Sequence, residues 1–315
     1  MNRRDLMKLG AGASVAALLN LGVDTGRAQD VSSLPLRGHE PDLIGGTKRG
    51  FKKAVMWDMI KGGTTVLEKF QILKEAGFDG VEMNSPGGPP NDEIKRACEK
   101  TGLLVEGMVD STHWKITLSH PNQSVRDQGL RDLEQALRDC KDLGGTSVLL
   151  VPGVVNANVT YDQCYERSQE QIRKALPLAQ ELGVRIAVED VWNDFLLSPL
   201  EAARYVDEFN NPAAIGWHMD IGNIMAYGYP EQWIHILGRR ILKLHVKEFS
   251  RSKMDKEGRW KGFDVKLGDG DINWKAVMTA LDAISYHTWM CAEVPGGDLD
   301  ALKDIARRMD GILAL

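Results

Sequence analysis

Four short apolar runs in the second half of the chain each end in a side chain that can ligate a metal or transfer a proton. The runs are RIAVE, IGWHMD, ILKLH and WMCAE, and they end at Glu189, Asp220, His245 and Glu293. If each run is a strand of one parallel barrel, the four side chains meet at the same rim. Three carboxylates and one imidazole suit one divalent metal ion such as Mn²⁺, Mg²⁺, Co²⁺ or Zn²⁺, held with coordination positions left open.

Two of these side chains also predict a type of reaction. Glu189 and Glu293 are expected on the fifth and eighth strands, so they would approach a ligand from different sides with the metal between them. The cation would polarise the carbonyl and hydroxyl oxygens of the ligand. One carboxylate would take a carbon-bound proton, and the other would return a proton to the opposite face or to the adjacent carbon.

These residues are positioned by a sequence unit that repeats along the chain, a helix followed by a strand. A stretch with helical periodicity closes on a glycine and a β-run follows almost at once, as in AGFDGVEM, TGLLVEGMV, LGGTSVLLV and LGVRIAVE. The closing residues fit helix C-terminal positions, where a left-handed conformation is needed: Gly77, Gly102, Gly144 and Gly183. The expected strands are 53–57, 80–83, 103–109, 147–151, 185–189, 214–220, 241–246 and 288–293.

Eight such units with nearly continuous apolar strands predict an α/β fold, a (β/α)₈ TIM barrel forming a single domain over residues 51–315. A doubly wound sheet is the rival architecture. It usually carries a glycine-rich phosphate loop after its first strand, and MWDMIKGGTT only weakly approximates one, so the barrel is favoured.

The start of the chain predicts export. Residues 1–28 carry paired arginines, Arg3 and Arg4, then an uncharged stretch and a small-residue cleavage site, and they resemble a twin-arginine signal peptide. Residues 29–50 lack periodicity and are expected to form a tail. The expected location is therefore the periplasm.

Composition excludes several classes of partner. The net charge of −5 disfavours binding to nucleic acid or to an anionic membrane. No segment is long and apolar enough for a membrane span. The four cysteines show no CxxC spacing, so we expect buried thiols: Cys98, Cys140 and Cys164 on helices, and Cys291 on a strand. A small sugar is the expected partner, and homo-oligomer formation is left open.

Side-chain alternation separates two further residues near the rim. Residues two apart on a strand face the same way, so His218 would lie below Asp220 as a deeper, hydrogen-bonded core histidine rather than a ligand. Lys247, two residues beyond His245, would either reach the mouth of the barrel or lie on a surface loop. The pattern does not decide between these two positions.

Five segments carry a resemblance to a known family: VEDVWNDFLLSP, GWHMDIGNIMAYGYPEQWI, KLHVKEFSR, LGDGDINW and CAEVPGGD. They resemble the xylose-isomerase-like barrel superfamily of sugar and sugar-phosphate isomerases and epimerases over residues 51–312. The similarity to its ketose 3-epimerases implies that Glu189, Asp220, His245 and Glu293 bind the metal and that the two glutamates are the acid/base pair. It also implies that Arg251 is the substrate-binding arginine.

The chain departs from the ketose 3-epimerase pattern at two places. Asn223 stands where those enzymes commonly carry a substrate-contacting histidine, and an amide can bind a hydroxyl but cannot transfer protons at neutral pH. Trp192, Asn193 and Phe195 stand in the loop where those enzymes carry a further glutamate. These departures leave the substrate open.

Other substrate-binding candidates surround the expected rim. Residues 249–270 could cradle a phosphate, stack Trp260 on a sugar ring, or form a solvated lid. Glu82, His113 and Trp114 follow the second and third strands and are expected at the same rim. Because sugar phosphates are mostly cytosolic, export favours an unphosphorylated substrate.

The sequence thus predicts a divalent-metal-dependent isomerase or epimerase of a small keto-sugar, working by proton transfer through a metal-stabilised enediolate. Two alternatives stay open: a metal-dependent lyase that eliminates from 3-keto-glycosides, and a non-catalytic periplasmic sugar-binding protein.

Overall fold

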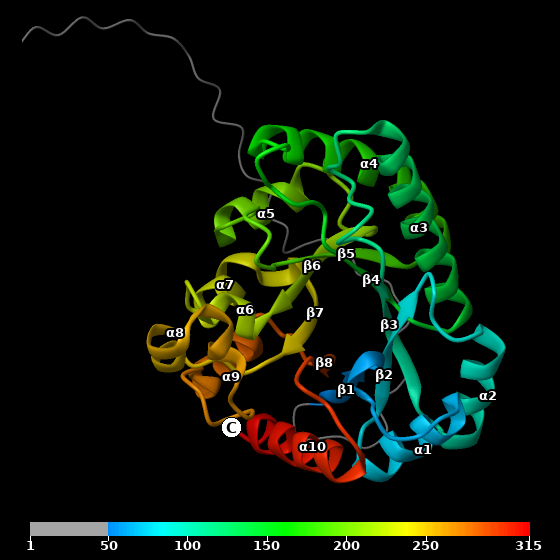
Figure 1. Ribbon diagram of the computed structural model, residues 1–315, viewed down its shortest axis with the longest axis vertical. Helices are drawn as coiled ribbons and strands as arrows, with labels where there is room; N and C mark the ends of the chain where they lie inside the picture. Colours follow the sequence, from blue (N-terminus) through cyan, green and yellow to red (C-terminus); the bar gives the residue numbers. More distant parts are fainter. Residues whose placement is uncertain (1–49) are drawn as a thin grey trace, which may run out of the picture. The chain divides into compact units, whose positions relative to one another are not determined.

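Eight parallel strands close into a barrel in the computed structural model, which describes residues 50–315. Their order around the barrel follows the chain, from β1 to β8, and β8 pairs with β1 to complete the ring (Figure 1). The strands are β1 Lys52–Met56, β2 Gly80–Ser85, β3 Leu104–Asp110, β4 Ser147–Leu150, β5 Arg185–Glu189, β6 Ile215–Asp220, β7 Ile241–Val246 and β8 Trp289–Ala292. The predicted (β/α)₈ barrel is confirmed, and each expected strand end lies within two residues of the observed one.

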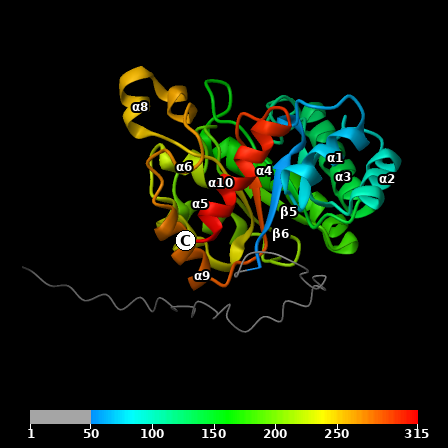
Figure 2. The ribbon, with the colours of Figure 1, turned by 90° about the horizontal axis from the view of Figure 1, so that it is seen from below.

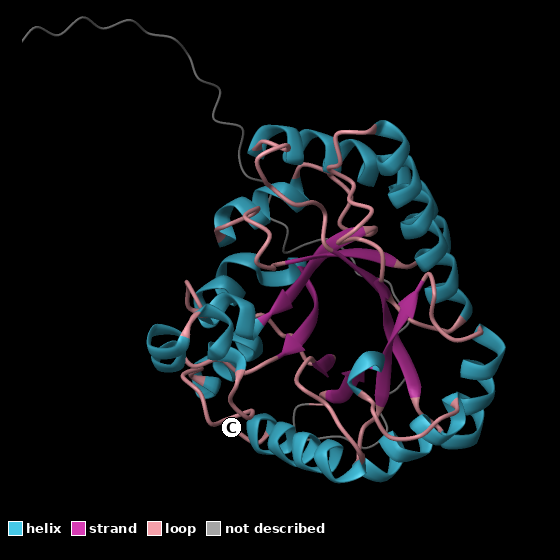
Figure 3. Ribbon diagram, viewed as in Figure 1, coloured by secondary structure: helices cyan, strands magenta, loops and turns pink. Residues whose placement is uncertain are grey.

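Helices surround the barrel on its outside (Figure 3). In chain order, the helical segments of residues 50–315 are η2 Trp57–Met59, α1 Val66–Ala76, α2 Asn91–Thr101, α3 Gln123–Asp142, α4 Tyr161–Leu182, α5 Pro199–Asp207, α6 Ile221–Met225, α7 Pro230–Leu237, η3 Gly238–Arg240, α8 Arg251–Glu257, η4 Arg259–Phe263, α9 Trp274–Ala283 and α10 Leu299–Leu313. Between β7 and β8, α8 and η4 come before α9, and Figure 2 shows α8 standing out from the barrel.

The helix ends follow the predicted glycines. Gly77, Gly102 and Gly183 end α1, α2 and α4 with φ angles of 91°, 71° and 67°. Gly144 adopts a φ of 79° just after α3. A side chain with Cβ is disfavoured in this left-handed region, so each glycine lets the helix stop and the next strand begin.

The barrel interior is not wholly apolar. Lys243 of β7 lies 2.7 Å from the Glu106 carboxylate of β3, and both side chains are buried. The register of strand pairing shifts at two places. One shift lies between Val81 and Glu82, where β2 pairs with β3, and the other lies between Trp217 and His218, where β6 pairs with β7. Such irregularities change which side chains share a level of the barrel. A buried polar layer therefore lies inside the ring of strands.

Two further expectations can be compared with the structure. Cys140, Cys164 and Cys291 are buried free thiols as expected, whereas Cys98 of α2 is only partly buried. Within residues 50–315, no helix is both long and apolar enough to cross a membrane. The expected signal peptide, and all of the expected tail except Gly50, lie outside the described residues.

Candidate metal centre and active site

The structure brings the four strand-end residues into one cluster. Glu189 and Asp220 are the last residues of β5 and β6, His245 is the second-last of β7, and Glu293 follows β8 directly. One ligand atom from each of the four lies within 4.8 Å of all the others. Three carboxylates and one imidazole at this spacing fit a hard or borderline divalent cation.

His245 lies at the centre of the cluster. Its Nδ1 is 3.1 Å from Glu189 Oε1 and 3.0 Å from Glu293 Oε2. The strand register explains part of this arrangement, because Asp220 pairs with His245 across β6 and β7. Neighbouring strands therefore present their ligands at the same height of the barrel.

Lys247 also belongs to this site. Its Nζ lies 2.9 Å from Asp220 Oδ2 and 2.8 Å from Glu293 Oε2, and the side chain is largely buried. Of the two positions that the sequence left open, the structure selects the mouth of the barrel. An ammonium group there offsets part of the repulsion among the carboxylates.

The surroundings push the pKa values of the two glutamates apart. Burial, with smaller contributions from Glu293 and Asp220, raises the pKa of Glu189 to about 7 despite its hydrogen bond with His245. Burial disfavours the Glu293 carboxylate as well, but Lys247 and His245 outweigh it and hold its pKa well below the usual range. Two carboxyl groups with opposite shifts can take different parts in proton transfer.

Asp190 is a site residue that the sequence reasoning missed. Its Oδ1 accepts hydrogen bonds from Trp217 Nε1 at 2.9 Å and from the backbone N–H of Asp220 at 3.2 Å. Burial, with the charges of Asp220 and Glu189, raises its pKa well above the usual range. The adjacent acidic residues in the segment VED could have indicated Asp190 as a candidate. Asp190 faces away from Glu189, its neighbour in the sequence, and contacts the backbone of Asp220.

Glu248 is a second missed residue, and it anchors the loop before α9. Its Oε2 accepts hydrogen bonds from the backbone N–H of Gly268 at 2.7 Å and from Trp274 Nε1 at 2.8 Å. Because a buried carboxylate needs such donors, Glu248 fixes the loop that carries the LGDGDINW motif beside the mouth of the barrel.

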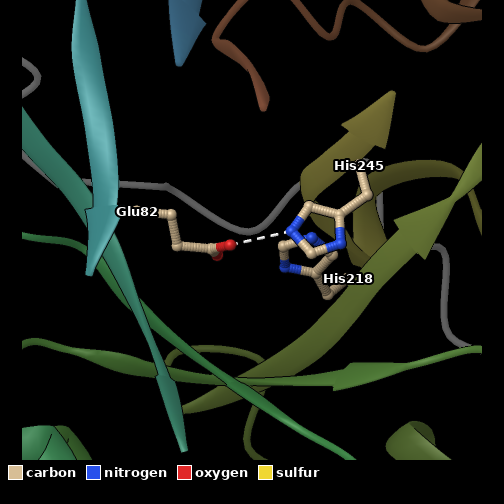
Figure 4. Close-up of side chains that lie close together, drawn as sticks. All are labelled: Glu82, His218 and His245. Atoms are coloured by element: carbon tan, nitrogen blue, oxygen red, sulfur yellow. Dashed lines mark hydrogen bonds and ion pairs between the residues drawn. The ribbon is translucent and has the colours of Figure 1, made fainter. Parts of the chain in front are cut away.

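Glu82 does not lie at the rim, and that expectation was wrong. Strand β2 runs two residues beyond its expected end, to Ser85, so Glu82 faces the interior at a lower level. It is 2% exposed, and its Oε2 lies 2.8 Å from His245 Nε2 (Figure 4). Glu82 therefore contacts a predicted metal ligand instead of lining the opening.

His218 lies deeper than Asp220, as predicted, and its ring packs against His245 with the ring centroids 4.1 Å apart. The expected hydrogen bonding is not found: among the described residues, neither ring nitrogen of His218 has a partner. Burial, with the positive charge of Lys243 nearby, holds the pKa of His218 well below the usual range, so the ring is neutral.

Two candidates, Arg251 and Asn223, direct their polar groups to other groups of the protein. Arg251 Nε donates to the carbonyl of Met225 at 2.8 Å, and the guanidinium stacks 4.8 Å from the centre of the Tyr229 ring. The Asn223 amide donates to the carbonyl of Asp190 at 2.9 Å and accepts from Lys247 at 3.4 Å. Asn223 thus links the metal cluster to the residues behind it.

The remaining candidates differ in exposure. His113 is buried and its Nδ1 accepts from the backbone N–H of Val151 at 3.1 Å; burial lowers the pKa of this histidine to about 3. Its neutral ring therefore carries its proton on Nε2. Trp114 is 49% exposed and Trp260 is 70% exposed. The Trp260 ring lies 4.8 Å from the ring of Trp192, in the loop after β5.

Comparison with known proteins identifies the family to which the barrel belongs. The model of the family described as xylose isomerase-like TIM barrel matches residues 70–312. An L-ribulose-5-phosphate 3-epimerase of Escherichia coli O1:K1 is 26% identical over 269 residues, covering 78% of this chain and 90% of that protein.

Two solved structures have a similar fold. One is a 3-keto-D-glucoside 4-epimerase from E. coli, at a TM-score of 0.68 and 17% identity, over 84% of this chain and 100% of the other. The second is a D-allulose 3-epimerase from a Methylomonas species in complex with D-allulose, at a TM-score of 0.65 and 17% identity, over 83% and 96% of the two chains.

Proposed function

This chain belongs to the xylose isomerase-like TIM barrel family and is a sugar isomerase or epimerase; we propose that it transfers a proton at a carbon beside the carbonyl of a small keto-sugar, aided by one divalent metal ion. The observation that carries the proposal is the cluster of Glu189, Asp220, His245 and Glu293, whose ligand atoms lie within 4.8 Å of one another. Mn²⁺, Mg²⁺, Co²⁺ and Zn²⁺ all accept this set of donors.

Each residue has a part in the reaction. A metal held by the four ligands would polarise the carbonyl and hydroxyl oxygens of the sugar. Glu189 and Glu293 share the proton transfers: one removes the proton from carbon, and the other delivers a proton to the opposite face or to the next carbon. Lys247, 2.8 Å from Glu293, holds that carboxylate ionised and in place.

The contacts of four basic residues in 249–270 support an unphosphorylated substrate. Lys253 Nζ donates to the carbonyl of Asp264 at 2.8 Å, and Lys266 pairs with Asp304 at 3.1 Å. Arg251 donates to backbone carbonyls, and the Arg259 guanidinium lies 4.2 Å from the centre of the Trp192 ring. These side chains are engaged with the protein, which favours sugar stacking on Trp260 over a phosphate cradle.

The central test is reaction in D₂O with ketopentoses, ketohexoses and 3-keto-glucosides, each with its phosphate ester where one exists. Epimerisation or isomerisation should return a sugar of substrate composition that carries solvent deuterium at the reacting carbon. Release of an aglycone would identify the lyase alternative. Tight sugar binding without any conversion would leave the binding-protein alternative and reject the proposed reaction.

Replacement of Trp260 should weaken substrate binding. We expect Trp260→Ala to raise KM by roughly 3-fold to 10-fold with little change in kcat, since loss of one aromatic stacking contact costs about 0.5 to 1.5 kcal/mol. Leu200→Ala is the matched control, because Leu200 is equally exposed, at 70%, but lies on α5. An unchanged KM for Trp260→Ala would remove Trp260 from the substrate-binding surface.

We also propose that the protein is exported by the twin-arginine route. The double substitution Arg3→Lys and Arg4→Lys should leave the precursor in the cytoplasm, because the export receptor recognises the paired guanidinium groups. The measurement is the periplasmic yield by cell fractionation, with Arg37→Lys as the control outside the leader. Normal periplasmic yield from the double variant would exclude this route.

A further inference from the structure

The two ring nitrogens of His245 have different partners. Nδ1 faces Glu189 and Glu293 at 3.1 and 3.0 Å, whereas Nε2 faces Glu82 at 2.8 Å (Figure 4). The side chains of His245 and Glu82 are 1% and 2% exposed, so water does not compete for the second contact. With a divalent ion in the cluster, a proton on Nε2 donated to Glu82 would leave the Nδ1 lone pair free to ligate the ion.

The barrel leaves space for this contact. Glu82 of β2 pairs in register with Gly107 of β3, which adds no side chain to the same level. The nearby carboxylate of Glu106 has its own partner, Lys243, at 2.7 Å. The interior therefore holds two buried carboxylates within 4.8 Å of each other, one paired with a lysine and the other with the histidine of the metal cluster.

We propose that Glu82 is a positioning residue for the metal centre: by accepting the Nε2 proton of His245, it fixes the tautomer and the ring orientation that present Nδ1 to the metal. This inference rests on the proposed metal site. A carboxylate behind a ligating histidine makes the imidazole a stronger ligand, and its removal typically lowers metal affinity by about 10-fold to 100-fold.

His218 also contacts the ring of His245, from deeper in the barrel. Its neutral ring packs edge-on against His245, with the ring centroids 4.1 Å apart and the planes at 69°. Glu82, His218 and His245 could also hold a second metal, since their ligand atoms lie within 4.8 Å of one another. The direct 2.8 Å contact between Glu82 and His245 favours the positioning role, because a metal between them would have to break it.

Three variants separate the positioning role from simple loss of a buried charge. Glu82→Leu removes the hydrogen-bond acceptor, Glu82→Gln removes the charge but keeps an acceptor oxygen, and Glu106→Gln removes a neighbouring charge that does not contact His245. Calorimetric titration of each metal-free protein with Mn²⁺ gives affinity and stoichiometry. The absorption spectrum of the Co²⁺-loaded proteins reports the ligand field, and thermal unfolding reports the fold.

Glu82→Leu should bind Mn²⁺ on the order of 10-fold to 100-fold more weakly and shift the Co²⁺ bands. Glu82→Gln should lie between it and the wild type. Glu106→Gln should keep affinity and spectrum even if its unfolding temperature falls. Wild-type affinity in a folded Glu82→Leu variant, or equal losses in Glu82→Leu and Glu106→Gln, would overturn the positioning role.

Stoichiometry tests the competing arrangement. Two ions per wild-type chain, one of them lost in His218→Ala, would replace the positioning role with a second metal site. A wild-type chain that binds no divalent ion would overturn both the proposed metal site and this inference. A wild type that binds one ion, with Glu82→Leu unchanged, would overturn the inference alone.

Discussion

Glu189→Gln and Glu293→Gln should each lower turnover by roughly 10²-fold or more, the usual scale of general acid/base catalysis. A carboxamide keeps the shape of the side chain and one ligand oxygen, but it cannot take up a proton at neutral pH. Each variant should therefore retain the fold and a measurable part of metal binding. The substitution therefore tests the role of each carboxylate in proton transfer while the fold is kept.

The measurement is kcat on a keto-sugar that the wild type converts, with metal content determined on the same samples. In D₂O, each variant should also lose deuterium incorporation at the reacting carbon. Glu99→Gln is the matched control, because Glu99 is an exposed residue of α2 away from the site. Wild-type turnover in both Gln variants with metal present would rule out a mechanism with two carboxylates.

Asp220→Ala and His245→Ala should each abolish stoichiometric metal binding. Asp220 and His245 pair across β6 and β7 at the centre of the cluster, and loss of either donor leaves fewer ligands for the ion. The backbone N–H of residue 220, which donates to Asp190, is kept in Asp220→Ala, so this variant removes only the side-chain ligand. The purified wild type should contain about one divalent ion per chain.

Elemental analysis of the dialysed proteins measures this directly. His235→Ala, at an exposed position on α7, is the control for loss of a histidine. The wild type should also unfold at a lower temperature after chelation, because an ion that binds only the folded state stabilises it. Stoichiometric metal in both site variants would show that the ligands were assigned wrongly.

The sequence alone was enough to predict the barrel and the position of its rim. The bounds of β5 and β7 match the expected ranges, because apolar runs bounded by a capping glycine or by polar residues mark a buried parallel strand clearly. Since parallel strands in a barrel end at one rim, the residues at four strand ends could be grouped before any contact was known. Glu189, Asp220, His245 and Glu293 were found in this way.

The contacts behind and beside that group depended on the tertiary structure. Glu82 and His245 are 163 residues apart, and β2 runs two residues past its expected end, so that Glu82 lies below the rim. The ammonium of Lys247 and the guanidinium of Arg251 end long, flexible stems, so strand periodicity does not determine where they point. Only the packed neighbours decide that Lys247 meets Asp220 and Glu293, while Arg251 turns to the carbonyl of Met225.

The same limit applies to Asp190 and His218. Alternation along a strand predicts that Asp190 faces away from Glu189 and that His218 faces inward, but it does not name the groups they meet. Asp190 finds Trp217 and the backbone of Asp220, whereas His218 meets the ring of His245. Local patterns determined which residues lie on each face of the barrel, and the close packing of strands distant in sequence determined which of them touch.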